Sequence, residues 1–373
     1  MRDVLDELME QWSRGRPVGL ATVVETWKSA PRPAGASMLV SSSGEALGSV
    51  SGGCVEGAVY EVASEAASDA SFTPVLERYG VSDDDAFAVG LTCGGTIHVY
   101  VERVTPETFP ELGEVAEAIR TGVPVAVVTC VDPADTERFG RRMVVFGDRT
   151  SGSFGSDRLD EAVTDDARGM LASGTTGTLR YGHDGERRKD ELTLAVASYA
   201  PKPRMIVFGA IDFAAALART GSFLGFHVTV CDARPVFATR RRFPDADEVV
   251  VDWPHRYLKA EAEAGRIDER TVLCVLTHDP KFDVPLLEVA LRLPVAYVGA
   301  MGSRRTHEDR LSRLREAGLR PGELARLRSP IGLDLGARTP EETAVSIAAE
   351  IIAVRWSGTG EALTGVEGPI HRG

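Results

Sequence analysis

The N-terminal part of this sequence contains one pattern twice, with the two copies about one hundred residues apart. Each copy starts with a Gly-x-Pro-Val segment and continues through two apolar runs, a Gly-Ser turn and a helical segment. Each then closes with Arg-Tyr-Gly before a last apolar run. Short apolar runs between turn residues are typical of strands. The order therefore predicts a β-β-α-β unit used twice, at about 15–104 and 122–199, with each unit forming a mixed sheet.

Residues 1–200 are thus expected to form a mixed α/β domain, and a different pattern begins after Pro201-Lys202-Pro203, a stiff linker. Beyond it, continuous apolar runs alternate with helical segments, which is typical of a parallel sheet covered by helices. The last helix is marked by a capping box at Thr339–Glu342. We predict a C-terminal Rossmann-like domain with a parallel sheet at 201–356 that folds on its own, and a flexible tail at 357–373.

The two copies of the repeat differ at two loops. Where the first copy has Ser51-Gly52-Gly53-Cys54, the second has Gly155-Ser156-Asp157-Arg158. Before its last strand the first copy has Leu91-Thr92-Cys93-Gly94-Gly95, and the second has only Lys189-Asp190. Since the second copy has the scaffold without these cysteine and glycine loops, function is the better reason for their presence in the first.

Two interpretations of Cys54 and Cys93 are open. In the first, they are working thiols on neighbouring loops of one glycine-lined pocket. Free loop amides there would bind an anion, and the helix dipole would lower the pKa of the thiol. In the second, each is a small buried residue beside a tight turn. Cys130, Cys231 and Cys274 lie inside apolar runs and are expected in the core. No Cys-x-x-Cys pair occurs, so we expect no structural metal site.

The start of the second domain resembles a dinucleotide-binding turn in position but not in composition. Gly209 follows the first apolar run, and Asp232 ends the next one, where an acid would bind a ribose. Ile211, however, replaces the glycine that lets the backbone approach a pyrophosphate. Asp212 puts a negative charge where phosphate would bind, unless it is only the helix cap. We therefore expect weak NAD(P) binding.

Two further strand ends should open into the same crevice, because open α/β sheets bind ligands at the carboxyl ends of their strands. His278 follows one of these strands, and Gly302 follows another. Ser303, Arg304 and Arg305 then start a helix whose amides and guanidinium groups would suit a phosphate. The plainer alternatives are a capped loop histidine and a solvated helix start.

Charge and composition exclude several classes of partner. The 373-residue chain has a net charge of −13, and nucleic-acid binders instead neutralise phosphates with Lys and Arg. No apolar run approaches the ~20 residues of a membrane span, and the acidic N-terminus has no signal core. Five widely spaced cysteines do not suggest a disulfide framework. We expect a cytoplasmic protein without a nucleic-acid or membrane partner.

Four segments resemble the XdhC/CoxI family of accessory proteins for xanthine dehydrogenase and CO dehydrogenase. GSVSGGCVE at 48–56 and LTCGG at 91–95 resemble the signature loops of the N-terminal domain of that family. YVGAMGSRR at 297–305 and SPIGLDLGARTPEE at 329–342 resemble segments of its C-terminal Rossmann domain. The match runs in order over most of the chain.

The resemblance implies a maturation factor, an accessory protein or chaperone more than a turnover enzyme. Such proteins bind the molybdenum cofactor (molybdopterin), support its sulfuration and pass it to a molybdenum hydroxylase apoenzyme. A cysteine desulfurase and a second copy of the chain are further candidate partners. Cys54 and Cys93 would then do the sulfur chemistry, since a soft thiolate suits a persulfide or molybdenum. The residues that would hold the cofactor are Ser51, Gly52, Gly53, Gly94, Gly95, Gly209, Asp232, His278, Gly302, Ser303, Arg304 and Arg305.

The chain departs from the family at Ile211-Asp212, where many members have Gly-x-Gly. Two alternatives therefore stay open. An NAD(P)-dependent oxidoreductase predicts nicotinamide binding and turnover, whereas a scaffold with a Rossmann interaction module predicts no small-molecule binding.

Overall fold

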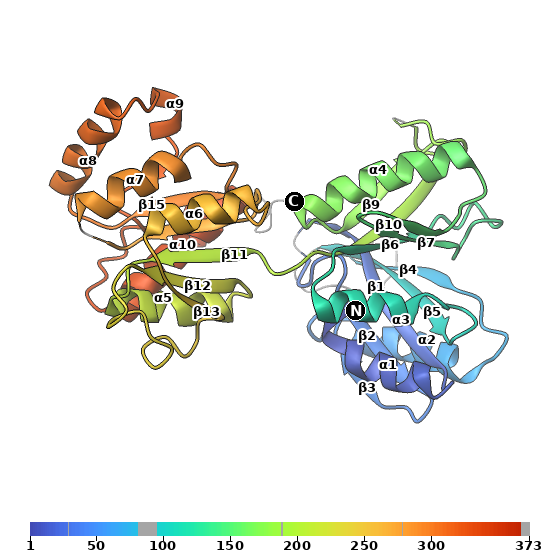
Figure 1. The fold of residues 1–373 in the computed structure, drawn as a ribbon. Coiled ribbons are helices and arrows are strands. Elements are labelled where there is room, and N and C mark those ends of the chain that lie inside the picture. Colours follow the sequence, from blue (N-terminus) through green and yellow to red (C-terminus); the bar gives the residue numbers. More distant parts are fainter. Residues whose placement is uncertain (29, 81–94, 188, 278, 367–373) are drawn as a thin grey trace. The chain divides into compact units, whose positions relative to one another are not determined.

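The computed structural model describes residues 1–28, 30–80, 95–187, 189–277 and 279–366, which divide into two compact units. Unit 1 ends at Pro201 and unit 2 begins at Lys202 (Figure 1). No helix in these ranges is long and apolar enough to cross a membrane. Each unit is described by itself below.

Unit 1 contains the two copies of the repeat, and each copy forms a five-stranded sheet with one long helix. The first sheet has the strand order β3-β2-β1-β5-β4, and the second has the order β8-β7-β6-β10-β9, so the copies share one topology. The elements of the first copy are α1 (Leu5–Ser13), β1 (Val18–Trp27), β2 (Ser37–Ser41), β3 (Ala46–Gly48), α2 (Glu56–Ser68), β4 (Val75–Gly80) and β5 (Thr96–Val104). Those of the second are α3 (Leu112–Thr121), β6 (Val125–Cys130), β7 (Arg142–Phe146), β8 (Thr150–Gly152), α4 (Asp157–Ser173), β9 (Gly177–Tyr181) and β10 (Leu192–Tyr199).

The expected mixed sheets were wrong, because every strand pair described in unit 1 is antiparallel. The sequence reading left out β4 and β9, the strands that carry the Arg-Tyr-Gly segments. Each of them follows the helix and reverses the chain once more, so that the last strand of the copy pairs antiparallel with the first. The two strands lie at sheet edges and are only half-buried, so they lack a clear apolar alternation.

The two sheets of unit 1 share one apolar layer. Leu20 and Leu39 of the first sheet and Val127 and Val144 of the second belong to a single buried cluster. Helix α2 covers the opposite face of the first sheet, and α4 covers that of the second, each with its own buried cluster. The result is a helix, sheet, sheet, helix arrangement in which the inner faces of the two sheets pack against each other and against α1 and α3.

Unit 2 is a six-stranded parallel sheet with the strand order β13-β12-β11-β14-β15-β16. This is the order of the Rossmann fold, and the predicted parallel sheet is confirmed. Helices α5 and α10 pack on one face, and α6, α7 and α8 pack on the other. The strands are β11 (Arg204–Phe208), β12 (His227–Asp232), β13 (Glu248–Val251), β14 (Val272–Val275), β15 (Tyr297–Ala300) and β16 (Leu327–Arg328). The helices are α5 (Asp212–Phe223), α6 (Pro254–Glu263), α7 (Pro280–Ala290), α8 (Arg304–Glu316), α9 (Pro321–Leu324) and α10 (Pro340–Arg355).

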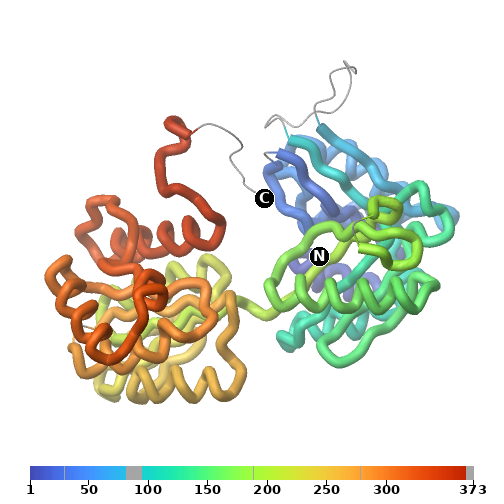
Figure 2. The backbone as a smooth tube through the Cα atoms, turned by 90° about the horizontal axis from the view of Figure 1, so that it is seen from above, coloured from blue at the N-terminus to red at the C-terminus, as the bar shows by residue number. Residues whose placement is uncertain are grey.

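The predicted capping box of the last helix is present. The Thr339 hydroxyl accepts from the Glu342 amide at 3.1 Å, and the Glu342 carboxylate accepts from the Thr339 amide at 3.1 Å. Between α10 and residue 366, where the description of the chain ends, there is one short 3₁₀ helix at Leu363–Gly365, which lies in the red end of the tube in Figure 2.

Gly19 of β1 marks the closest approach between sheet and helix in the first copy. A Cβ atom at this position would lie 1.9 Å from the backbone carbonyl oxygen of Ala63 in α2. We predict that Gly19→Ala lowers the free energy of unfolding by at least about 2 kcal/mol, because the sheet or the helix must move. Chemical denaturation measures this change. The control is Gly57→Ala in α2, where a Cβ meets nothing within 4 Å and alanine should be neutral or stabilising by up to about 1 kcal/mol. Equal effects of the two substitutions would contradict the packing described here.

Candidate functional site

The loop at 48–55, ahead of α2, is held by the carboxylate of Glu56, the first residue of that helix. This carboxylate accepts hydrogen bonds from the Ser49 hydroxyl at 2.7 Å, the Ser51 amide at 2.9 Å and the Gly53 amide at 2.8 Å. The Ser51 hydroxyl also donates to it. Glu56 thus reaches back over the loop and fixes its shape.

Three further amides of this loop are engaged as well. The Ser51 hydroxyl oxygen accepts from the amides of Cys54 and Val55 at 3.0 Å each, and the Ser49 hydroxyl oxygen accepts from the Gly52 amide at 2.9 Å. The expectation of free amides at this turn was therefore wrong. Two serines and a glutamate in the same short segment provide acceptors for them.

The hydrogen bonds that Glu56 accepts stabilise its charged form. Burial raises the pKa of Glu56, but hydrogen bonds from the Ser51 and Ser49 hydroxyls and the Ser51 amide outweigh burial and lower the pKa to about 2. The carboxylate is therefore ionised at neutral pH and acts as a built-in anion in the loop.

Cys54 lies at the boundary between the loop and the core. Its side chain is half-buried and packs against the cluster between α2 and the first sheet. Gly52 and Gly53 beside it are exposed, with φ angles of 73° and 121°, and a Cβ on either one meets nothing within 4 Å. One side of the Cys54 loop is therefore open enough for a bulky group to approach the backbone.

The three strand cysteines differ from Cys54, and their predicted place in the core is confirmed. Cys130, Cys231 and Cys274 are fully buried. Burial raises the pKa of Cys130 to about 11 and also raises those of Cys231 and Cys274. These thiols are neutral and inaccessible.

The second copy has a smaller counterpart of this tether and no cysteine. Asp160, the counterpart of Glu56, accepts from the Phe154 amide at 2.9 Å. Arg158 stands where the first copy has Cys54, and its guanidinium forms an ion pair at 2.8 Å with Asp184, from the turn between β9 and β10. Asp184 also accepts from the Ser156 hydroxyl at 2.7 Å. The two loops that correspond to the cysteine loops of the first copy are therefore in contact.

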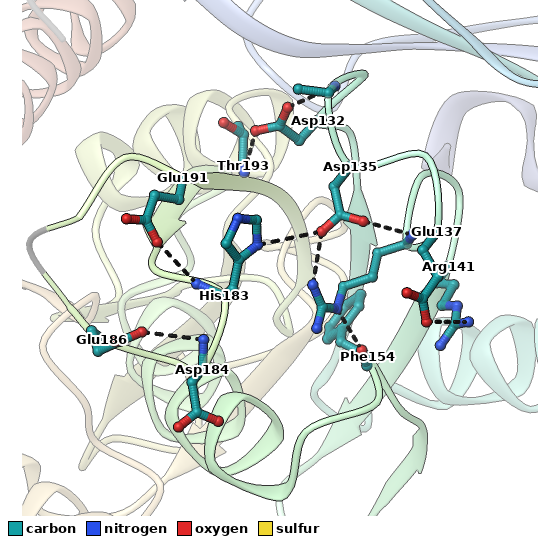
Figure 3. A network of polar contacts seen from close by, with 12 residues as sticks. Asp132, Asp135, Glu137, Arg141, Phe154, His183, Asp184, Glu186, Glu191 and Thr193 are labelled. Carbon is teal, nitrogen blue, oxygen red and sulfur yellow. Dashed lines mark hydrogen bonds and ion pairs between the residues drawn. The ribbon is translucent and has the colours of Figure 1, made fainter.

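A polar network that sequence analysis did not predict lies at the same end of the second copy (Figure 3). Asp135 forms an ion pair with Arg138 at 2.8 Å and lies 3.6 Å from Nδ1 of His183. Burial raises the pKa of Asp135, but Arg138 and His183 outweigh it and lower the pKa. Arg138 Nε also donates to the Phe154 carbonyl at 2.8 Å. The network therefore joins the loop after β6, the segment before α4 and the β9–β10 turn.

Three of the predicted site residues, Cys93, Gly94 and His278, lie outside the described residues. Gly95 is described, and it is buried directly ahead of β5.

In unit 2 a pocket of about 500 Å³ opens where the strand order changes direction, at the carboxyl ends of β11, β12 and β14. Gly209 and Asp232 line it, as the sequence predicts for the crevice, together with Thr277 and Lys281. Gly302, Ser303, Arg304 and Arg305 do not belong to its lining. They start α8, where the Ser303 hydroxyl accepts from the Thr306 amide at 3.1 Å and both arginines are exposed.

The carboxylate of Asp232 is fully engaged. Arg234 binds it through Nε at 2.9 Å and a terminal nitrogen at 2.8 Å, while the backbone amides of Arg234 and Ala210 donate to it at 2.9 Å and 2.7 Å. Burial raises the pKa of Asp232, and these hydrogen bonds lower it to below its usual range. A ribose hydroxyl would reach Asp232 only if Arg234 moved.

A buried ion pair of unit 2 contacts Thr277, a residue of the pocket lining. Arg310 of α8 and Asp283 of α7 lie 2.8 Å apart and are almost fully buried. Asp283 also accepts from the Thr277 hydroxyl, and Arg310 donates to the Met301 carbonyl at 2.9 Å. The pair fixes the ends of β14 and β15, which is a structural role that the sequence reading did not assign to these residues.

Comparison with known proteins agrees with this division of the chain. Residues 205–351 match the XdhC Rossmann domain, and residues 11–80 and 118–182 match the XdhC and CoxI family. A Bacillus subtilis protein named as a probable subunit of xanthine dehydrogenase is 31% identical over 356 residues, which cover 94% of this chain and 96% of the relative. The molybdenum cofactor insertion chaperone PaoD from Escherichia coli is 26% identical over 354 residues, which cover 95% and 88%.

Among solved structures, a xanthine dehydrogenase from Bacillus halodurans matches with a TM-score of 0.67 at 25% sequence identity. The match covers 97% of each chain.

The Glu56 tether predicts a pH-dependent stability. Because the folded-state pKa lies below the unfolded value, the contribution of Glu56 is present above pH 4.5 and is lost as the pH falls towards 2. We predict that Glu56→Gln lowers the free energy of unfolding by about 1–2 kcal/mol at pH 7 and has little effect near pH 2. Urea denaturation across this range measures it. Asp160→Asn, which removes a carboxylate that accepts one loop amide, is the control and should cost less. A Glu56→Gln effect that does not shrink on acidification would contradict the assignment.

The crevice of unit 2 predicts weak nicotinamide binding. Asp212 is exposed at the start of α5. Arg234 binds the carboxylate of Asp232, the acid that would hold the ribose. We expect calorimetric titration with NADH to give a dissociation constant no tighter than about 1 mM, a binding free energy near −4 kcal/mol. A micromolar value would favour the oxidoreductase alternative.

Proposed function

The chain belongs to the XdhC and CoxI family, and from this premise we propose that it is a molybdenum-cofactor-binding maturation factor. The cofactor is its cargo. The protein supports the sulfuration of this cofactor and inserts it into a molybdenum hydroxylase apoenzyme of the xanthine dehydrogenase type. The relative PaoD, named as an insertion chaperone, aligns along 95% of this chain. That length of alignment supports a shared task more than a shared domain.

One observation assigns this function to the Cys54 loop: the second copy repeats the scaffold around Cys54 without the cysteine. Asp160, like Glu56, accepts from a backbone amide of the loop before its helix, and Arg158 takes the place of Cys54 in the second copy. A thiol is thus not required to build this loop. We assign Cys54 to function because the structural work is done by its neighbours.

The second copy also supports the pairing of Cys54 with Cys93. There, Asp184 in the β9–β10 turn contacts Ser156 and Arg158 in the loop before the helix. In the first copy the chain between β4 and β5 contains Cys93 and starts from the matching end of the sheet. By this analogy the two cysteines belong to neighbouring loops, and their shared site stays a prediction.

The chemistry proposed for Cys54 is sulfur transfer. Its thiolate attacks the terminal sulfur of a donor persulfide, such as that of a cysteine desulfurase, and the donor leaves as a thiolate. Cys54 then carries the persulfide. The open side formed by Gly52 and Gly53 gives the donor and the cargo access to this sulfur. The loop amides cannot also hold the phosphate of the cargo while Glu56 occupies them. We propose Ser303, Arg304 and Arg305, which are exposed at the start of α8 in unit 2, as a separate site for an anionic group.

We predict that Cys54→Ser reduces activation of a partner apoenzyme by at least about tenfold, a loss of roughly 1.4 kcal/mol or more in transition-state terms. The change should leave the melting temperature nearly unchanged, because the side chain is only half-buried and the serine hydroxyl can be hydrated at the edge of the core. The measurements are enzyme activity after reconstitution with cofactor and the fluorescence of bound pterin after oxidation.

Cys130→Ser is the matched control, since it makes the same substitution at a buried strand position. It should lower the melting temperature and leave activation per folded molecule intact. If Cys54→Ser activates normally while Cys130→Ser only destabilises, the thiol has no role and only the family assignment stands.

A further inference from the structure

Helix α10 of unit 2 is apolar on two opposite faces. The inner face packs into the core beside α5 through Ala344, Ile347 and Ile351. On the outer face, Val345 is 55% exposed and Ile352 is 44% exposed. A surface helix normally carries polar residues on its outer side. An apolar outer face therefore calls for a partner that covers it.

The apolar residues on the outer side of α10 form one continuous line. Val345, Ala349, Ile352 and Trp356 follow one another at spacings of three or four residues, which places them along one side of the helix. Trp356, at the end of the helix, is 60% exposed. Ala349, in the middle, is half-buried and small enough to let a second helix approach closely. These four residues are called the outer stripe below.

Opposite charges stand at the two ends of the outer stripe. Glu341 is exposed in the first turn of α10, and Arg355 is exposed in the last turn. Within the described ranges, neither of them forms an ion pair, whereas arginines such as Arg204 and Arg219 of the same unit do. Burial and the nearby Arg270 lower the pKa of Arg355. A carboxylate brought to Arg355 would therefore stabilise its charge.

We propose that the outer stripe is the contact surface between two copies of this chain, with their α10 helices packed antiparallel about a two-fold axis near Ala349. In this arrangement Val345 of one copy meets Ile352 of the other, because the two residues lie four residues before and three residues after Ala349. The acidic end of each helix meets the basic end of the other, so the Glu341–Arg355 pairing forms twice. The helix dipoles also favour this packing, because the negative end of each helix lies beside the positive end of the other.

Self-complementarity is the reason for choosing a second copy over another occupant. A two-fold interface must present a surface that fits itself, with every residue pair occurring twice. The outer stripe has this property in both its apolar pattern and its charges. A different protein or a lipid surface would require neither the central small residue nor the opposite charges at the two ends.

The first test is the oligomeric state of the full chain by sedimentation equilibrium. We expect a dimer, and we expect Val345→Glu to raise its dissociation constant by at least about 30-fold, as for a central interface residue. Val123→Glu is the matched control. Val123 is also exposed, at 48%, but lies in unit 1 between α3 and β6, so the dimer should be unaffected. A wild-type monomer overturns the proposal, and so does a dimer that both substitutions weaken equally.

The second test uses charge reversal, which does not depend on the apolar core of the contact. Glu341→Arg and Arg355→Glu should each weaken the dimer, and the double variant should restore it. Each reversal also opposes the helix dipole, so the double variant should have the lowest monomer melting temperature while its dimer recovers. A double variant whose dimer is weaker than either single one overturns the antiparallel arrangement.

Discussion

Unit 1 depends on the apolar layer that its two sheets share. Each sheet has two apolar faces, but each copy supplies only one long helix to cover them. The faces left over are buried against each other and against α1 and α3, in one cluster that includes Leu20, Val127 and Leu112. Each copy therefore supplies part of the cover that the sheet of the other copy needs. This layer also gives the loop before α2 a rigid base, since the helix that follows this loop packs on a sheet fixed from the other side.

The parts of the fold that could be predicted from sequence are those with strong periodic signals. The buried strands of unit 2 form continuous apolar runs, and the repeat is visible because both copies keep the same turn residues. The strands β4 and β9 could not be found this way, because they lie at sheet edges and are half-buried. Helix α8 is so rich in charge that only its Ser303 cap marks it. Because β4 and β9 were not predicted, mixed sheets were expected where the strands are antiparallel.

The candidate site shows the same limit at the level of single residues. Comparison of the two copies singled out Cys54, but free amides were expected where Ser51 and Glu56 occupy them. Those acceptors are close in sequence and could have been recognised as a local tether. The pairing of Asp135 with His183 could not, because it joins two loops that only the folded sheet brings together. Nor does the sequence show that Arg234 closes over Asp232, which depends on the turn after β12.

The shared layer also has a consequence for synthesis on the ribosome. The first copy leaves the ribosome with its inner face uncovered, and the surface that must cover it is about one hundred residues behind. At roughly 5–20 residues per second, that delay lasts several seconds to about twenty seconds. During that time a nascent sheet with an open apolar face is exposed to the cell. A slowly translated codon between α3 and β10 would lengthen this exposure, whereas one after β10 would fall when unit 1 is already closed.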